Sequence, residues 1–149
     1  MVVRRAEVED AGDVARLLYA FNTEYDDPTP EPPQLAARMR ELMAADTVVL
    51  LAGDGPDGVA VLRFRLSIWS SGKECYLAEL YVTPERRGQG LGRALMERAI
   101  EVAREEGANW MDLGTSEDDV AARALYESLG FINREGPDGP IAYFYEREL

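Results

Sequence analysis

The fold is decided by one continuous stretch, Ala78-Glu79-Leu80-Tyr81-Val82-Thr83-Pro84-Glu85-Arg86-Arg87-Gly88-Gln89-Gly90-Leu91-Gly92-Arg93-Ala94-Leu95-Met96. Its first part is apolar and aromatic apart from Glu79, a pattern that predicts a strand. Pro84 ends that strand, because proline has no N–H for the ladder. From Leu91 onward the apolar residues recur at helical spacing, so the three glycines lie where a strand gives way to a helix.

A junction of this kind suits a phosphate or pyrophosphate. The first N–H groups of a helix lack partners, the helix dipole is positive there, and glycines let the backbone approach a ligand closely. The Gly-Lys-Ser/Thr ending of a P-loop is absent. The dinucleotide fingerprint G-x-G-x-x-G also fails, because Arg93 occupies the place of its third glycine. Taken alone, the stretch is also compatible with a glycine-rich turn that binds nothing.

A second motif narrows the interpretation. The run Arg87-Gly88-Gln89-Gly90-Leu91-Gly92 reads R-x-x-G-x-G, and Ala124-Leu125-Tyr126-Glu127-Ser128-Leu129-Gly130-Phe131 reads A-x-Y-x-x-x-G-F. Together they closely resemble the acyl-CoA pyrophosphate loop and the helix end of the GNAT superfamily of N-acetyltransferases. The close match covers residues 76–131, and the N-terminal half matches only in its order of elements.

The resemblance implies a single N-acetyltransferase domain over residues 1–149, with an α+β (mixed α/β) three-layer fold. Its central sheet would be mixed and largely antiparallel, with about six or seven strands, a parallel pair splayed at the acyl-CoA site, and about four helices. The sequence pattern places strands near residues 2–7, 47–52, 59–69, 76–82 and 110–113, and closing strands at 131–134 and 141–148. Helices are expected over residues 10–21, 33–45 and 91–107, and after residue 116, with Ser116 as the N-cap.

Composition limits the chemistry. At 149 residues with 46% hydrophobic content, the chain is of ordinary size for one globular domain. A net charge of −12 disfavours nucleic acid and favours cations. No apolar run reaches a membrane span, and no signal peptide is evident, so a cytoplasmic location is expected. There is no histidine and only one cysteine, Cys75, which argues against a metal site, a disulfide framework and a histidine-activated nucleophile.

The resemblance also implies the reaction, transfer of an acetyl group from acetyl-CoA to an amine. Backbone N–H groups from Gly88 to Arg93 would hold the pyrophosphate, with charge added by Arg87 or Arg93. The pantetheine arm would lie along Leu80, Tyr81 and Val82. The full set of expected cofactor-binding residues is Leu80, Tyr81, Val82, Arg87, Gly88, Gln89, Gly90, Leu91, Gly92, Arg93 and Asp119. Many members of the family carry Asn where this chain has Asp119.

Two residues are expected to be catalytic. Glu79 matches the position of the glutamate that often serves as the base in this superfamily, and Tyr126 matches its general-acid tyrosine. With no histidine beside Cys75, direct attack in a ternary complex is favoured over an acetyl-enzyme. The alternatives are a strand-end carboxylate paired with an arginine for Glu79 and a core tyrosine for Tyr126.

The acceptor is defined least well. Tyr25, Asp26, Asp27 and Trp69 combine aromatic rings with carboxylates, which suits a small cationic amine, although they also fit a solvated loop. The expected partners are acyl-CoA and an amine, with neither nucleic acid nor membrane, and a homodimer is possible through the final strand. The alternatives in function are a non-catalytic acyl-CoA sensor and a protein or peptide N-acetyltransferase.

Overall fold

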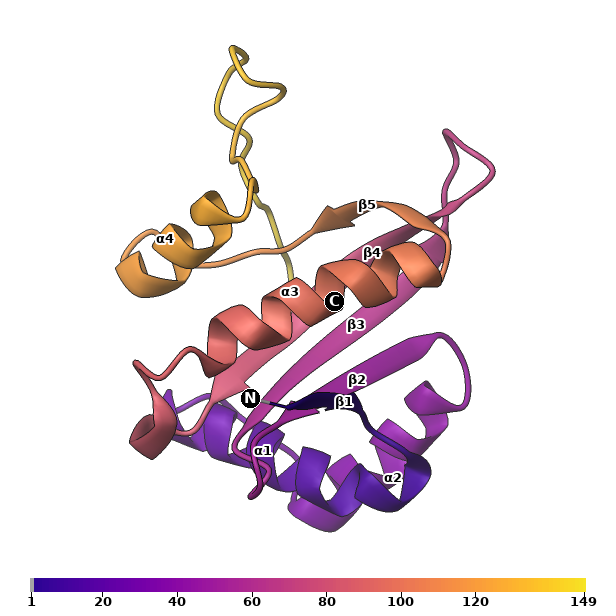
Figure 1. Ribbon diagram of the computed structural model, residues 1–149, viewed down its shortest axis with the longest axis vertical. Coiled ribbons are helices and arrows are strands. Elements are labelled where there is room, and N and C mark those ends of the chain that lie inside the picture. The colour runs from indigo at the N-terminus through magenta and orange to yellow at the C-terminus, as the bar shows by residue number, and fades with distance from the viewer. Residues whose placement is uncertain (1) are drawn as a thin grey trace. The chain divides into compact units, whose positions relative to one another are not determined.

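The computed structural model describes residues 2–149. The chain consists of two compact units. The first extends to Met111 and the second runs from Asp112 to Leu149. The first unit holds almost the whole of a five-stranded sheet, with helices on both of its faces (Figure 1). The second unit holds one helix and the C-terminal segment.

The strands follow the chain in order across the sheet, as β1 (Val3–Arg5), β2 (Thr47–Ala52), β3 (Gly58–Leu66), β4 (Lys73–Val82) and β5 (Ala108–Asp112). The three pairs from β1 to β4 are antiparallel. The Lys73 N–H at the start of β4 donates to the Gly107 carbonyl just before β5, at 3.0 Å. β4 and β5 therefore begin at the same end of the sheet and run parallel to each other. The mixed, largely antiparallel sheet is confirmed, with five strands rather than six or seven.

The sheet is covered by α1 (Ala11–Glu24) and α2 (Pro32–Met43) on one face and by α3 (Leu91–Glu105) on the other (Figure 1). The first helix extends three residues beyond the predicted end. The prediction stopped early because Asn22, Thr23 and Glu24 are polar and do not contribute to the apolar pattern. In α2, Pro32 takes the first helical position, where its missing N–H costs nothing. Short 3-10 turns, η1 (Val8–Asp10) and η2 (Pro84–Arg86), precede α1 and the glycine loop.

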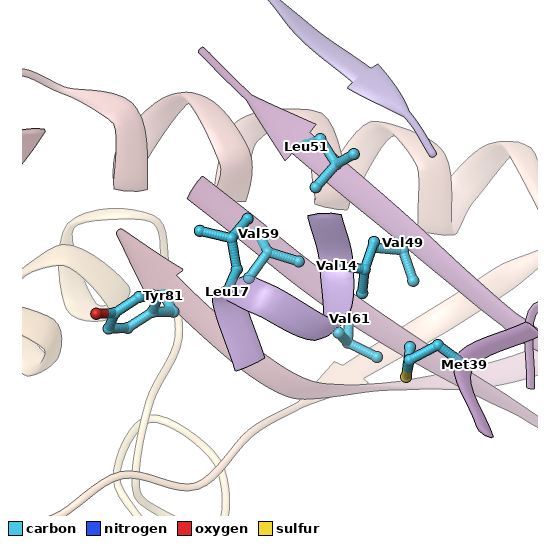
Figure 2. Packing of buried hydrophobic residues seen from close by; sticks show 8 residues of the cluster. All are labelled: Val14, Leu17, Met39, Val49, Leu51, Val59, Val61 and Tyr81. Carbon is cyan, nitrogen blue, oxygen red and sulfur yellow. The ribbon is translucent and has the colours of Figure 1, made fainter. Parts of the chain in front are cut away.

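The core on the α1–α2 face forms because alternate residues of β2 and β3 point to the same side of the sheet. Figure 2 shows the side chains that meet there, which are Val14, Leu17, Met39, Val49, Leu51, Val59, Val61 and Tyr81. Each is at most 5% exposed. Burying one such aliphatic side chain stabilises the fold by roughly 1.5–3 kcal/mol. This packing fixes α1 against β4, which carries the predicted site.

Strand β4 contains a bulge. Opposite it, Val61 pairs with Glu79 but Leu62 pairs with Leu77, so Ala78 is the extra residue. A bulge bends a strand and leaves backbone groups outside the ladder. It lies immediately before Glu79, so the backbone groups that it frees are next to the predicted base.

The second unit departs from prediction in two ways. Helix α4 (Val120–Ser128) is capped by Asp119, whose carboxylate accepts from the Ala122 N–H at 3.3 Å, so Ser116 is not its N-cap. The predicted closing strands are absent from the described residues, and only one isolated bridge joins Arg134 to Ile141.

The sequence predicts the two closing strands on either side of the turn at 136–140, over residues 131–134 and 141–148. In the structure Tyr143 and Tyr145 are 75% and 86% exposed, and their rings lie 6.4 Å apart. Alternation alone cannot make a strand, because the backbone groups of a strand also need a partner to pair with.

Candidate active site

The glycine loop between β4 and α3 is built as the sequence predicts. Gly88 and Gly90 adopt left-handed backbone conformations, with φ of 75° and 87°, which few other residues tolerate. Gly90 is the N-cap of α3 and offers no side chain to its first turn. Its carbonyl accepts from the Ala94 N–H at 3.0 Å. The start of α3 therefore presents backbone N–H groups next to an N-cap residue that has no side chain, which is an arrangement that suits an anion.

The loop is tied to the β2–β3 turn. Arg86 donates to the Asp57 carboxylate at 2.8 Å and to the Gln89 side-chain oxygen at 3.0 Å. The Thr83 N–H donates to the Asp57 carbonyl at 2.8 Å. The side chain of Gln89, which was expected at the cofactor, is therefore used within the loop. These contacts hold the loop in place before any ligand binds.

Arg87 is engaged with its neighbours rather than directed into the loop. Its guanidinium donates to both carboxylate oxygens of Glu24, the last residue of α1, with N–O distances of 2.9 Å. Its Nε donates to the Val82 carbonyl at 3.0 Å. The Tyr81 hydroxyl donates to the same Glu24 carboxylate at 2.9 Å, and the guanidinium lies 5.6 Å from the Tyr81 ring centre. Burial is the main cause that raises the pKa of Tyr81 to about 12, followed by its bond to Glu24.

Glu79 is a half-buried carboxyl group on the bulged part of β4. Its pKa is raised, first by burial, which disfavours the charged form, and then by the negative charge of Asp27. No arginine contributes to this shift, so the alternative of a carboxylate paired with an arginine finds no support. The negative charge of Asp27, three residues beyond the end of α1, thus disfavours the charged form of Glu79.

Tyr126 and Asp119 belong to the second unit. Tyr126 is 9% exposed, and its ring packs edge-on against Phe131 with 6.2 Å between ring centres. Its pKa is raised to about 12, mainly by burial and then by the charge of Asp119. The Asp119 carboxylate caps α4, and this local role explains an acidic residue at that position.

The residues predicted for the acceptor do not form one cluster. Tyr25 packs edge-on against Phe21, with ring centres 5.5 Å apart, and remains more than half exposed. Asp26 has φ of 56°, an unusual backbone conformation that turns the chain after α1. Trp69 lies beyond the end of β3 and is 89% exposed.

A cavity of about 430 Å³ opens in the first unit, at the end of the sheet where β2 and β4 begin. Thr47, Phe64, Lys73 and Glu106 are among its lining residues. It contains none of the predicted site residues. Lys73 and Val82 stand at opposite ends of β4, about 30 Å apart at strand rise, so this cavity is not the predicted acyl-CoA site.

Two features are absent from residues 2–149. No group of three or more His, Cys, Asp or Glu side chains is arranged to hold a metal ion. No helix is both long and apolar enough to cross a membrane.

Comparison with known proteins gives the class. The model of the Acetyltransferase (GNAT) family matches residues 14–131, which include the bulged strand, the glycine loop and α4. The chain therefore belongs to the GNAT family of acetyltransferases, as the two motifs indicated.

Individual relatives agree with this. The thialysine N-epsilon-acetyltransferase of Bos taurus is 26% identical over 160 residues, covering 99% of this chain and 94% of that protein. The mycothiol acetyltransferase of Beutenbergia cavernae is 34% identical over 100 residues, covering 65% of this chain but only 32% of its own length. A crystal structure of a candidate acetyltransferase from Arthrobacter sp. FB24 superposes with a TM-score of 0.90 and 45% identity, covering 100% of this chain and 96% of that one.

Proposed function

We propose that this protein transfers an acetyl group from acetyl-CoA to a primary amine by direct attack within a ternary complex, and that the acceptor is a small cationic amine. The two units would act together as one N-acetyltransferase domain. The observation that carries the proposal is the continuous segment formed by bulged β4, the glycine loop and the start of α3. It carries the half-buried carboxyl group of Glu79 near the end of the strand and, after the loop, a helix start suited to an anion.

Acetyl-CoA would bind along this unit. The backbone N–H groups from Gly88 to Arg93 would receive the diphosphate, and the pantetheine arm would follow β4 from Leu80 to Val82. A backbone N–H of Tyr81 or Val82 would donate to the thioester oxygen as negative charge develops on it. Losing one such donor typically costs about 3–4 kcal/mol of transition-state stabilisation.

Glu79 would take the proton of the attacking amine, either directly or through water. A primary alkyl amine has a pKa of roughly 10.4, so deprotonating it at neutral pH costs about 4–5 kcal/mol. The raised pKa of Glu79 brings this carboxylate closer in basicity to the amine than an ordinary glutamate, which favours the transfer.

Tyr126 would act on the departing sulfur. The ordinary pKa of a tyrosine, about 10, is close enough to that of a thiol for proton transfer, but burial raises the pKa of Tyr126 to about 12. Full proton transfer from such a phenol to a thiolate with a pKa near 8.5 is uphill by about 5 kcal/mol. Tyr126 is therefore better suited to donate a hydrogen bond to the developing thiolate than to lose its proton completely. The same shift keeps the hydroxyl protonated throughout the neutral range.

The acceptor proposal relies on charge. Asp26 and Asp27 lie two and three residues beyond the end of α1, and the charge of Asp27 acts on Glu79, so a cationic amine would meet negative charge on its way to the base. The name of the Bos taurus relative, thialysine N-epsilon-acetyltransferase, specifies acetyl transfer to an amine nitrogen of a small molecule, which is compatible with this proposal. Because Trp69 is almost fully exposed, we assign it no part in binding the amine.

The test is release of free CoA thiol from acetyl-CoA over a panel of polyamines, aminoglycosides, amino acids and peptides. We expect turnover with at least one small cationic amine, and a fall of about 10²-fold in kcat for Tyr126→Phe. The matched control is Tyr76→Phe, which removes a hydroxyl from a partly exposed position on the same strand as Glu79. Coenzyme A binding with no turnover on any amine would contradict the proposal and favour an acyl-CoA sensor.

A further inference from the structure

The carboxylate of Glu24 has more partners than any other acidic group of the proposed site. Arg87 bonds both of its oxygens at 2.9 Å, and the Tyr81 hydroxyl bonds one of them at 2.9 Å. These contacts lower the pKa of Glu24, and the hydrogen bond from Arg87 is the largest cause. Glu24 is therefore a charged group whose acceptor positions are largely filled by the protein itself.

Glu24 also lies at the boundary between two regions. On one side is Arg87, the first residue of the R-x-x-G-x-G loop. On the other side are Asp26 and Asp27, just beyond the end of α1, where the charge of Asp27 acts on Glu79. The Glu24 carboxylate thus contacts Arg87 of the glycine loop, and it lies three residues before Asp27, whose charge acts on the proposed base Glu79.

We propose that Glu24 is the binding group for a second cationic centre of the acceptor, and that Arg87 occupies it until the diphosphate of acetyl-CoA draws Arg87 away. This inference rests on the proposed function, and it assigns the acceptor class as a diamine or a longer polyamine.

The physical basis is competition for one guanidinium. Arginine binds carboxylates and phosphates through a fork of two N–H groups. Arg87 uses both terminal nitrogens for Glu24 and its Nε for the Val82 carbonyl, so it has no fork left for a diphosphate while these bonds last. When the diphosphate takes Arg87, Glu24 keeps only its hydrogen bonds from the hydroxyls of Tyr81 and Tyr25, and its charge is left without a cation. An ammonium group of the acceptor would replace the lost partner. Because coupling between two binding sites is reciprocal, each ligand would strengthen the binding of the other.

The first test measures the affinity for CoA by calorimetry in the wild type, Glu24→Gln, Arg87→Ala and the double variant. Gln keeps an oxygen for the Tyr81 hydroxyl but removes the charge that holds Arg87. We expect Glu24→Gln to bind CoA about threefold to tenfold more tightly, a range set by the partial exposure of the ion pair. In the Arg87→Ala background the same substitution should change the affinity less than twofold.

The matched control is Glu85→Gln, which removes one negative charge from the exposed turn η2 beside the same loop but removes no bond to the Arg87 side chain, whose partners are Glu24 and the Val82 carbonyl. It should leave the affinity for CoA within twofold of the wild type. Equal tightening by Glu85→Gln and Glu24→Gln would show a general charge effect and overturn the proposal. Weaker binding in Glu24→Gln, or the same gain with and without Arg87, would also overturn it.

The second test concerns the acceptor. The affinity for CoA is measured with and without 1,5-diaminopentane, and with pentylamine as the probe that lacks the second charge. The diamine should tighten CoA binding severalfold in the wild type and have no effect in Glu24→Gln, whereas pentylamine should have none in either protein. Equal effects of both amines, or no effect of the diamine, would refute the assignment of Glu24. Failure of the wild type to bind CoA at all would instead refute the proposed function.

Discussion

The surroundings of Glu79 disfavour its charge. It is half-buried in the part of β4 from Tyr76 to Val82, which is otherwise apolar and aromatic, and its pKa is raised by burial and by Asp27, with no cation among the causes. A carboxylate in this environment is a stronger base than one in water, because protonation relieves both penalties. The same environment means that a charged Glu79 lowers the stability of the fold. A position that keeps an ionisable group at the expense of stability is a candidate for function.

This environment sets a pH dependence. The base must be ionised, so kcat/KM should fall as the pH drops through the pKa of Glu79. Asp27→Asn removes the second cause of the raised pKa, so the pKa of Glu79 should decrease and the acidic limb should move to lower pH. The measurement is kcat/KM against pH in both proteins. Asp26→Asn is the control, because Asp26 is not among the causes and Asn tolerates its backbone conformation. An unmoved limb in Asp27→Asn, or an equal shift in Asp26→Asn, would exclude this coupling.

Thr47 offers a test of stability far from the proposed chemistry. It is 5% exposed at the start of β2, and its hydroxyl oxygen has no hydrogen-bond partner among residues 2–149. Valine keeps the branched shape and removes the unsatisfied group, so Thr47→Val should raise the free energy of unfolding by about 1 kcal/mol. Urea denaturation measures the change. Thr23→Val, at an exposed position of α1, should remain within about 0.5 kcal/mol of the wild type. A destabilised Thr47→Val would mean that the hydroxyl is satisfied in solution.

Single residues also mark the limit of prediction from sequence. Glu79, Tyr126 and the loop glycines could be singled out because each belongs to a local pattern. The pairing of Glu24 with Arg87 could not, since 63 positions separate them and no local signal connects them. Sequence placed Arg87 at a phosphate, whereas in the structure its guanidinium lies on a carboxylate. Only the folded position of α1 against β4 makes that contact visible.

At the scale of elements, the patterns that succeeded are those whose cause is local. Helix α3 begins at Leu91 as predicted, because its apolar spacing and the preceding glycines both mark that point. Strand β2 matches its predicted bounds, since a short β-branched run is enclosed by turns on both sides. The prediction of the closing strands was wrong because pairing depends on a neighbour, and among residues 2–149 the pairing of these segments is limited to the bridge between Arg134 and Ile141.

The glycine loop gives a prediction at this scale. Gly90 has φ of 87°, and a methyl group there would meet open space, so the cost of Gly90→Ala is backbone strain of about 1–2 kcal/mol without a clash. That open space is where a diphosphate would approach, so the affinity for CoA should fall by at least about tenfold, a loss of roughly 1.4 kcal/mol. Thermal unfolding and calorimetry separate the two effects.

Gly12→Ala provides the control for that substitution. Gly12 lies in the first turn of α1, also with open space around it, and its backbone is not in the left-handed region. Alanine there should stabilise the helix by up to about 1 kcal/mol and leave CoA binding unchanged. If folded Gly90→Ala bound CoA as tightly as the wild type, the loop would not be the diphosphate site.

The charge of the whole molecule bears on the acceptor. A net charge of −12 on 149 residues surrounds the protein with a field that attracts cations and repels anions. For acetyl-CoA this field is a disadvantage, which local groups such as the α3 N-terminus and its arginines must offset. For a cationic amine it is an advantage that acts before any contact is made. The binding of the two substrates should therefore respond differently to salt.

Salt dependence tests this. Raising the ionic strength from about 0.05 to 0.5 M shortens the screening length from roughly 14 to 4 Å, so long-range attraction is mostly lost. We expect kcat/KM for 1,5-diaminopentane to fall severalfold over this range. Pentylamine carries half the charge, so the logarithm of its kcat/KM should fall about half as steeply. At saturating amine, kcat should hold steady, because screening acts on encounter and binding rather than on the chemical step. Equal slopes for the two amines would mean that the charge of the protein serves solubility alone and does not select the acceptor.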